Sequence, residues 1–335
     1  MSQRYAQIAG VGSYLPERVL TNAELEAMVD TSDEWIVSRT GIKERRIAAP
    51  EQATSDLAVE ACQRALDCAG LSAEQVDLFV VGTATPDHLM PSTACVAQRK
   101  LGLTCPAFDV NAACSGFIYA LQVGAAAIES GRAQTVLVAG ADTLSRIIDF
   151  EDRSTCVLFG DGAGAVVLTT AEEPGVMSIV LGADGKGTDH LKVPAGGSSV
   201  PCSDSVIEER SHFLTMNGPE VFKFAVRVIP RATIEALDAC GYGVDDLRWL
   251  VPHQANKRIL DTVEERLGID DSRVFSNLER TGNTSAASIP LALDDLYTSG
   301  QLAPGDLLAL VGFGAGLTWG AAVLKWTVPA PDKER

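Results

Sequence analysis

Short continuous apolar runs alternate along the chain with longer stretches of helical spacing. The runs at 76–82, 135–140 and 306–312 predict buried strands, and Gln7–Gly12 is expected to form another short strand. Stretches in which apolar positions recur at helical spacing and end at a glycine, such as 55–70, predict amphipathic helices. Strands that alternate with helices in this way predict an α/β fold with helices on both faces of each sheet.

Further elements follow from local signals. Ser32–Ile42 and Pro91–Leu101 are expected helices, and another is expected after the capping box Thr21–Glu24. The glycine-rich segment 158–168 is expected to feed a strand. Residues 183–213 are rich in Gly, Ser and Asp and show little periodicity, which predicts a long surface loop; loops of this length are usually functional or mobile.

The second half of the chain repeats the first. The helix end Ala65–Gly70 has a counterpart at Ala236–Gly241, and the strand that follows it is repeated as well. The spacing is about 170 residues, half of the chain. We therefore predict two similar α/β halves, 1–175 and 176–335, packed as a pseudo-dimer.

The repeat predicts that candidate catalytic residues of the two halves lie close together. Cys114 in the first half corresponds roughly to Gly282-Asn283-Thr284 in the second, and Gly82, at the end of a strand, corresponds to His253. Ligands of α/β sheets bind at the carboxyl ends of strands, so equivalent loops of two pseudosymmetric halves converge at one crevice. Cys114, His253 and Asn283 are therefore predicted to share one site.

Composition excludes several classes of protein. With 335 residues, 46% hydrophobic and 21% charged, the chain has the composition of an ordinary globular protein. The net charge of −17 argues against nucleic-acid binding. An apolar signal core, a run of transmembrane length, a CxxC pair and a Cys/His metal cluster are all missing from the sequence. The eight cysteines are therefore expected to be reduced thiols in a cytoplasm, with no metal and no resident cofactor.

Cys114 lies where an extended apolar segment, Phe108–Val110, runs into a helix that begins with Ser115-Gly116. The N-terminus of a helix carries partial positive charge and free N–H groups, which favour a thiolate. One interpretation is a nucleophile that carries an acyl group as a thioester. The other is a small buried hydrophobe, as most free cysteines are.

The second half supplies three further candidates. His253 comes just after a buried strand, and Asn283 lies in a run of small residues that opens a helix. Their structural alternatives are a core histidine bonded to a backbone carbonyl and an asparagine N-cap. The glycine-rich segment Gly312–Gly320 lets the backbone pass close to a neighbour and can offer an N–H to an oxyanion.

Cysteine, histidine and asparagine together suit two kinds of enzyme. A neutral imidazole and a carboxamide donate hydrogen bonds without carrying charge, which suits an enolate oxygen in a decarboxylative Claisen condensation. A cysteine protease uses the histidine as a base and the asparagine to orient it. Two duplicated halves favour the condensing enzyme, because a protease does not need them.

Four motifs in order carry a resemblance to a known family. Asn111–Gly116, His253–Asn256, Gly282–Thr284 and Gly312–Gly316 resemble the β-ketoacyl-acyl-carrier-protein synthase III family of the thiolase superfamily, and the likeness runs from about Tyr14 to Gly320. It implies a thiolase-like fold of five layers, αβαβα, in a homodimer. It also implies condensation of a primer acyl-CoA, acetyl or longer, with malonyl-acyl carrier protein to β-ketoacyl-acyl carrier protein, which initiates fatty acid biosynthesis.

The resemblance implies a role for each matching residue. Cys114 takes the acyl group, His253 and Asn283 promote malonyl decarboxylation, and the N–H groups of Cys114 and Ala315 form the oxyanion hole. The matching coenzyme A positions are, for the nucleotide end, Trp35, Arg39, Thr40 and Arg153, and, for the pantetheine channel, Gly218, Ala255 and Asn256. Met90 matches the residue that reaches into the acyl pocket of the partner subunit.

Two departures leave specificity open. The position of Met90 is often phenylalanine in acetyl-primed members, and a flexible methionine admits a longer chain. Positive charge for an acidic carrier protein comes from a local patch, interrupted by Glu264 and Glu265, that comprises Lys223, Arg227, Lys257, Arg258 and Arg266. The alternative enzyme hypothesis is a secondary-metabolite condensing enzyme of the same fold that uses another acyl or aroyl thioester, or malonyl-CoA. An inactive carrier or scaffold protein is disfavoured by the complete triad.

Overall fold

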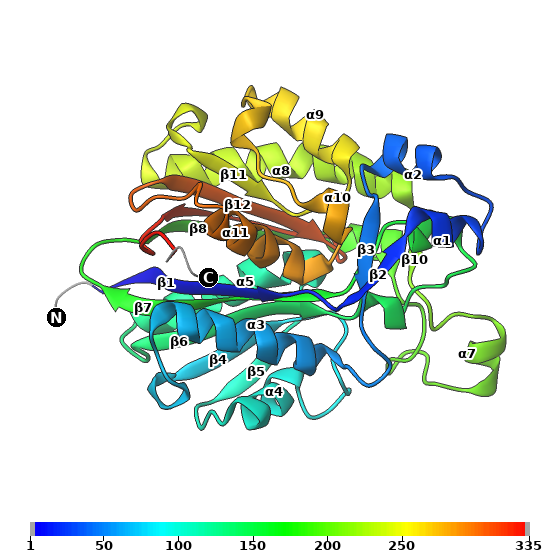
Figure 1. Cartoon of the computed structure of the whole chain (residues 1–335), viewed down its shortest axis with the longest axis horizontal. Helices are drawn as coiled ribbons and strands as arrows, with labels where there is room; N and C mark the ends of the chain where they lie inside the picture. The colour runs from blue at the N-terminus through cyan, green and yellow to red at the C-terminus, as the bar shows by residue number, and fades with distance from the viewer. Residues whose placement is uncertain (1–3, 332–335) are drawn as a thin grey trace.

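Two mixed β-sheets, one from each half of the chain, carry the fold (Figure 1). The computed structural model describes residues 4–331. The first sheet has the strand order β1-β7-β6-β4-β5, comprising β1 (Tyr5–Tyr14), β7 (Gly162–Ala171), β6 (Thr135–Asp142), β4 (Leu78–Gly82) and β5 (Ala107–Val110). The second has the order β11-β12-β13-β8, comprising β11 (Trp249–Pro252), β12 (Leu307–Gly314), β13 (Thr318–Lys325) and β8 (Val176–Ala183).

Helices form the other three layers (Figure 1). Between the sheets lie α5 (Gly116–Glu129) and α11 (Ser288–Thr298), which contact strands of both. The outer face of the first sheet is covered by α3 (Thr54–Ala69) and α4 (Thr93–Leu101). On the outer face of the second sheet lies α8 (Gly218–Cys240), with α9 (Lys257–Leu267) packed against it. The five-layered αβαβα arrangement expected from the sequence is therefore confirmed.

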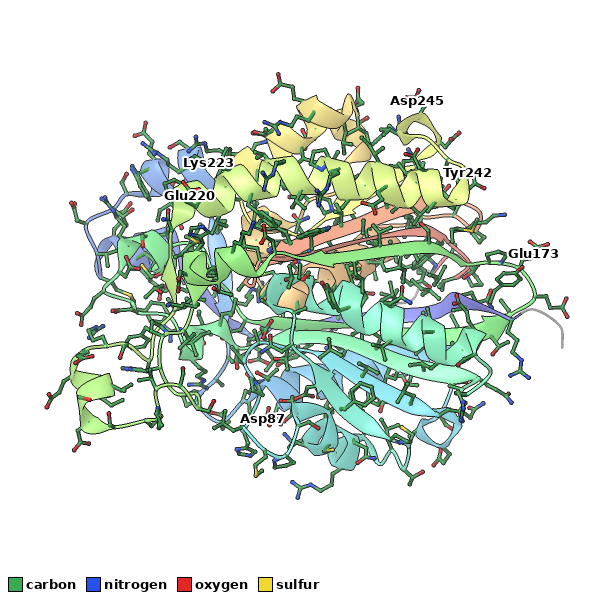
Figure 2. The ribbon with its side chains drawn as sticks, turned by 180° about the vertical axis from the view of Figure 1, so that it is seen from behind. Asp87, Glu173, Glu220, Lys223, Tyr242 and Asp245 are labelled. Carbon is green, nitrogen blue, oxygen red and sulfur yellow. The ribbon has the colours of Figure 1, made fainter. Side chains whose placement is uncertain are left out.

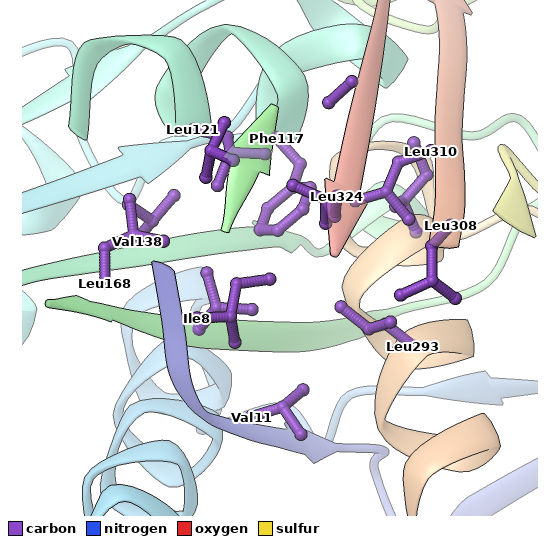
Figure 3. Packing of buried hydrophobic residues seen from close by; sticks show 14 of the residues in the cluster. Ile8, Val11, Phe117, Leu121, Val138, Leu168, Leu293, Leu308, Leu310 and Leu324 are labelled. Atoms are coloured by element: carbon purple, nitrogen blue, oxygen red, sulfur yellow. The ribbon is translucent and has the colours of Figure 1, made fainter. Parts of the chain in front are cut away.

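Most side chains of the central layer are apolar, and both sheets bury them. Figure 3 shows Phe117 and Leu121 of α5 and Leu293 of α11 among side chains of both sheets, including Ile8 and Leu310, and all five are buried. The long apolar run of α5 needs such an environment. This layer fixes the starts of α5 and α11, where the candidate residues lie.

The two halves are related at the entrance to each central helix. A 3-10 turn precedes each of them, Ala113–Ser115 before α5 and Ser285–Ala287 before α11. The first residue of each turn has a positive φ, 48° at Ala113 and 52° at Ser285. Element order therefore aligns Cys114 with Ala286, a few residues beyond the sequence-based estimate. The proposed boundary at 175/176 falls between β7 and β8.

A smaller layer of short elements covers one end of the sheets. It comprises the two-stranded antiparallel sheet of β2 (Arg18–Thr21) and β3 (Glu44–Ile47), with the helices α1 (Asn22–Glu26), α2 (Asp33–Thr40), α6 (Arg153–Cys156) and α10 (Leu278–Thr281). The predicted capping box is confirmed at the start of α1, where the Thr21 and Glu24 side chains each bond the other's backbone N–H. Ser32 caps α2 by accepting a hydrogen bond from the Trp35 N–H.

Two parts of the chain differ from the sequence-based expectation. Residues 183–213 are not a structureless loop: a 3-10 turn and β9 (Leu191–Lys192) come first, then α7 (Asp204–Glu208), and β10 (Thr215–Met216) follows and pairs with β9. Figure 1 shows α7 standing out from the layered body. The glycine-rich C-terminal segment also leads into a full strand, β13, that was not predicted from the sequence.

Candidate active site

Cys114 lies in the 3-10 turn that leads into α5, between the two sheets. The helix itself begins two residues later, at Gly116. The end of β4 packs closely against the start of this helix. A Cβ on Gly82 would lie 2.6 Å from the carbonyl carbon of Gly116. The predicted position at a helix entrance is therefore correct, and only 7% of the Cys114 surface is exposed.

Burial decides the protonation of this thiol. It raises the pKa of Cys114 to about 12, against a smaller opposing effect of the neighbouring Ser285 side chain. The expectation of a resting thiolate is therefore wrong, because the cost of burying the charge exceeds the benefit of the helix N-terminus. At neutral pH the free protein holds Cys114 as a thiol.

His253 follows β11 and is 1% exposed. Its Nδ1 lies 2.5 Å from the Ser288 hydroxyl of α11, and its backbone N–H donates to the Val311 carbonyl at 2.8 Å. The ring meets that of Phe313 edge-on, with centroids 5.5 Å apart. Burial lowers the pKa of His253 to about 3, so the imidazole is neutral at physiological pH.

Asn283 is held by the segment 158–160 and by its own loop. Its backbone N–H donates to the Leu158 carbonyl at 2.8 Å, and its carbonyl accepts from the Gly160 N–H at 3.0 Å. The side-chain oxygen accepts from the Ser285 N–H at 2.9 Å. Because the oxygen is engaged, the amide NH2 is the group that remains to donate to a ligand.

The end of β12 lies directly against the Cys114 turn. A Cβ on Gly314 would lie 2.6 Å from the Cys114 nitrogen and 3.0 Å from the Ala112 oxygen. Only glycine permits this approach. Ala315, the expected second oxyanion donor, follows at once.

One cavity of about 650 Å³ joins these residues. Cys114, His253 and Asn283 all line it, so the structure brings the predicted triad together. The same cavity is lined by most of the predicted coenzyme A positions, namely Trp35, Arg39, Thr40, Gly218, Ala255 and Asn256. Arg153 adjoins them through Trp35, whose ring lies 4.9 Å from the Arg153 guanidinium and 5.5 Å from that of Arg39.

Comparisons with known proteins agree with this geometry. Residues 108–185 and 237–326 match the models of 3-oxoacyl-[acyl-carrier-protein] synthase III and of its C-terminal region. The β-ketoacyl-[acyl-carrier-protein] synthase III of Caldanaerobacter subterraneus is 54% identical over 96% of this chain and 98% of its own. The synthase III of Thermus thermophilus is 50% identical, with a TM-score of 0.89 over 96% of this chain and 99% of that one.

The chain belongs to the 3-oxoacyl-[acyl-carrier-protein] synthase III family. Membership confirms the predicted family, the thiolase-like α/β fold and the predicted enzyme class, a β-ketoacyl-acyl-carrier-protein synthase III acting in fatty acid biosynthesis. A priming β-ketosynthase of the R1128 polyketide pathway is also similar, at 40% identity and a TM-score of 0.91 over 98% of both chains.

The expected basic residues of the synthase lie on α8 and α9. Lys223, Arg227, Lys257 and Arg258 are exposed there, and Lys223 and Arg258 also line the main cavity. Figure 2 shows Lys223 beside Glu220 near the start of α8, and the two are ion-paired at 2.7 Å. Lys257 pairs with Asp261 at 2.6 Å. Arg266 is partly used internally, because it donates to the Val226 carbonyl at 2.8 Å.

Met90 lies apart from the cavity. It precedes α4 and is 83% exposed, next to Leu89, which is 88% exposed. Two adjacent apolar side chains this exposed suggest a surface that another protein covers.

Sequence reasoning missed the residues that hold the triad in place. Ser288 contacts His253, Ser285 lies beside Cys114, and Thr318 contacts the Cys114 turn. Ser285 and Ser288 belong to the small-residue run after Asn283, whose composition also fits an ordinary helix start. Only the fold shows which of them face the site.

None of the helices among residues 4–331 combines the length and the apolar character needed to cross a membrane.

Proposed function

We propose that this synthase condenses a primer acyl-CoA with malonyl-acyl carrier protein to β-ketoacyl-acyl carrier protein, releasing CO2 and initiating fatty acid synthesis. One observation carries the proposal: Cys114, His253 and Asn283 line the same cavity as the side chains expected to bind coenzyme A. A nucleophile and two neutral donors in a buried site suit two half-reactions on one thiol.

In the first half-reaction Cys114 attacks the carbonyl of the acyl-CoA. The new carbon–sulfur bond forms first, giving a tetrahedral intermediate; the bond to the coenzyme then breaks, and the proton of the Cys114 thiol ends on the departing coenzyme A thiol. The oxyanion of the tetrahedral intermediate receives the N–H groups of Cys114 and Ala315. The close packing of Gly314 on the Cys114 turn supports this pairing.

In the second half-reaction the malonyl group loses CO2 to give an enolate. The enolate oxygen accepts hydrogen bonds from the neutral His253 imidazole and the Asn283 amide, and the enolate carbon attacks the Cys114 thioester. A carbon–carbon bond forms, the carbon–sulfur bond breaks, and the released thiolate takes up a proton. Because burial lowers the pKa of His253 to about 3, the ring donates without bringing a positive charge into the site.

The substrate thioesters enter through the main cavity. Trp35, Arg39, Thr40 and Arg153 hold the nucleotide end of coenzyme A, and the channel past Gly218, Ala255 and Asn256 holds the pantetheine. An arginine over an aromatic ring provides a stacking surface for a base and a charge for a phosphate.

The enzyme acts as a cytoplasmic homodimer, in which Met90 of one subunit closes the acyl pocket of the other. The exposure of Leu89 and Met90 supports such a contact. Lys223, Arg227, Lys257 and Arg258 attract the acidic carrier protein, because they give a chain of net charge −17 a local basic surface at the cavity.

The test separates the two half-reactions. His253→Ala and Asn283→Ala are expected to retain acylation of Cys114, measured as a mass adduct after incubation with acyl-CoA, and to lose malonyl decarboxylation, measured as CO2 release. His212→Ala, in the 183–213 segment, is the matched histidine control. Equal loss of both steps in the two site variants would refute the assigned roles. Wild-type condensation by Cys114→Ser would refute the reaction itself.

The alternative, a secondary-metabolite condensing enzyme, has one supporting observation, the similarity to the R1128 priming synthase. A panel of primer acyl-CoA thioesters decides between the two. Turnover restricted to a primer outside fatty acid metabolism would support the alternative.

A further inference from the structure

Two hydroxyl groups join the Cys114 turn to the turn that follows β12. Ser115 Oγ lies 2.8 Å from Thr318 Oγ1 and 2.8 Å from the Ala112 carbonyl oxygen. Thr318 Oγ1 lies 3.0 Å from the Ala112 oxygen and 3.1 Å from the Ala315 oxygen. The two hydroxyls thus bridge segments 203 positions apart in the sequence.

Both segments bear a proposed oxyanion donor. Ser115 directly follows Cys114, and Thr318 lies three residues beyond Ala315. The bonded carbonyls belong to Ala112, within the Cys114 turn, and to Ala315 itself. The bridge therefore ties together the two short pieces of backbone whose N–H groups must converge on one oxygen atom.

Besides the bridge, these pieces are held by close backbone packing and by the β12–β13 ladder, in which Gly314 pairs with Thr318. Gly314 contacts the Cys114 turn through its backbone alone, because a Cβ at this position would collide with the turn. On its other side, the β12–β13 turn is held by Leu317, which exchanges two backbone hydrogen bonds with Asp184 at 2.7 and 2.8 Å. Ser115 is completely buried, where a hydroxyl keeps fixed partners.

We propose that Ser115 and Thr318 are positioning residues for acyl transfer, whose hydroxyls fix the spacing between the N–H groups of Cys114 and Ala315. The inference rests on the proposed function. Donors of an oxyanion hole act because they are preorganised around the developing charge. A displacement of about 1 Å can cost roughly 100-fold in rate.

This role predicts a selective defect. Charge develops on the oxygen of the Cys114-bound acyl group during acylation and again when the enolate attacks. During decarboxylation it develops on the malonyl thioester oxygen, at His253 and Asn283. Loss of the bridge should therefore slow acyl transfer and spare decarboxylation.

The central variant is Thr318→Val, which keeps the branched shape and removes the hydroxyl. Its single-turnover acylation by acyl-CoA should fall roughly ten- to hundredfold, because the donors are displaced rather than removed. Decarboxylation of malonyl-acyl carrier protein without primer, and the KM for acyl-CoA, should stay within about twofold of wild type. Thr318→Ser keeps the hydroxyl and should restore acylation.

Two further variants complete the experiment. Ser115→Ala removes the other hydroxyl and should give the same selective defect, so the test survives if Thr318→Val folds poorly. Thr233→Val removes a buried hydroxyl of α8 that bonds the Ile229 carbonyl at 2.9 Å, far along the chain from the site, and should change neither step. Thermal melting of each variant tests whether it is folded.

The outcomes are distinguishable. Unchanged acylation in both Thr318→Val and Ser115→Ala, or equal slowing of acylation and decarboxylation, overturns the positioning role while leaving the proposed function intact. If His253→Ala and Asn283→Ala do not separate the two half-reactions, the roles assigned to those residues fail, and wild-type condensation by Cys114→Ser would overturn the proposed function itself. A defect that Thr318→Ser does not rescue assigns the effect to packing and also overturns the proposal.

Discussion

At the scale of single residues, the site is built from uncharged groups. Burial raises the pKa of Cys114 to about 12 and lowers that of His253 to about 3, so neither carries a charge at neutral pH. A thiolate–imidazolium pair, the resting state of many cysteine hydrolases, is therefore not what this site stabilises. The neutral imidazole of His253 and the amide of Asn283 suit an enolate that must remain reactive toward the neighbouring thioester.

The raised pKa of Cys114 predicts its reactivity with iodoacetamide. Only the thiolate reacts, so the alkylation rate of Cys114 should rise about tenfold per pH unit from pH 7 to pH 9.5 without a plateau. The measurement follows the Cys114 peptide by mass spectrometry, because Cys95 and Cys202 are exposed and also react. A plateau below pH 8 would show a stabilised thiolate and contradict the burial argument.

The lowered pKa of His253 predicts a flat pH profile for decarboxylation. Its imidazole stays neutral down to about pH 3, so the rate of malonyl decarboxylation should change less than about twofold between pH 5.5 and pH 8. Unfolded His253 binds a proton near pH 6.5, so this residue removes stability as the pH falls from 6.5 toward 3. Thermal melting at each pH separates unfolding from chemistry. A change in the decarboxylation rate that is centred near pH 6.5, while the protein stays folded, would contradict the prediction.

At the scale of elements, the sequence predicted most of the strands and helices that surround the site but not the contacts within it. The repeat and the apolar runs located β4, β6, β12 and the helix after Cys114 because each is a continuous buried segment. Ser288 could not be assigned to His253, because that contact depends on how α11 crosses β11. The strand β13 was missed because it begins at Thr318, inside the glycine-rich segment Gly312–Gly320, and Gly320 within it weakens the strand pattern.

The helix α2 gives an element-scale prediction. Ser32 caps it by accepting from the Trp35 N–H at 3.1 Å, and α2 presents Trp35, Arg39 and Thr40 to the cavity. Ser32→Ala should cost about 1 kcal/mol of local stability. The KM for acyl-CoA should rise, by at most about fivefold, because a cost of this size loosens the helix that carries the coenzyme site, while kcat stays unchanged.

Steady-state kinetics with acyl-CoA as the varied substrate measures this effect. Ser203→Ala removes the cap of α7 and is the matched control. An equal rise of KM in the control, or a fall of kcat in Ser32→Ala, would argue against a specific role of α2.

At the scale of the whole molecule, carrier-protein binding must overcome a net charge of −17. Arg227 is exposed on α8 and lines a smaller cavity of about 270 Å³ beside the main one, together with Lys223. Arg227→Glu should raise the KM for malonyl-acyl carrier protein about tenfold, through like-charge repulsion, and leave the KM for acyl-CoA unchanged. Arg132→Glu makes the same charge change beyond the end of α5. A similar loss in that control would assign the effect to net charge alone.

The proposal that Met90 of one subunit closes the acyl pocket of the other requires a homodimer. Met90→Phe should shift primer preference toward acetyl-CoA, because the larger, stiffer side chain shortens the pocket.

If Met90 acts across the interface, the primer preference of an active site must depend on the residue at position 90 of the partner subunit. In a heterodimer whose active subunit keeps Met90 and whose partner carries Cys114→Ser with Met90→Phe, turnover should show the acetyl preference. In the reverse pairing, the active subunit carries Met90→Phe and the Cys114→Ser partner keeps Met90, and the wild-type preference should return. Preference that instead follows the active subunit would place Met90 in its own pocket and remove the reason for a functional dimer.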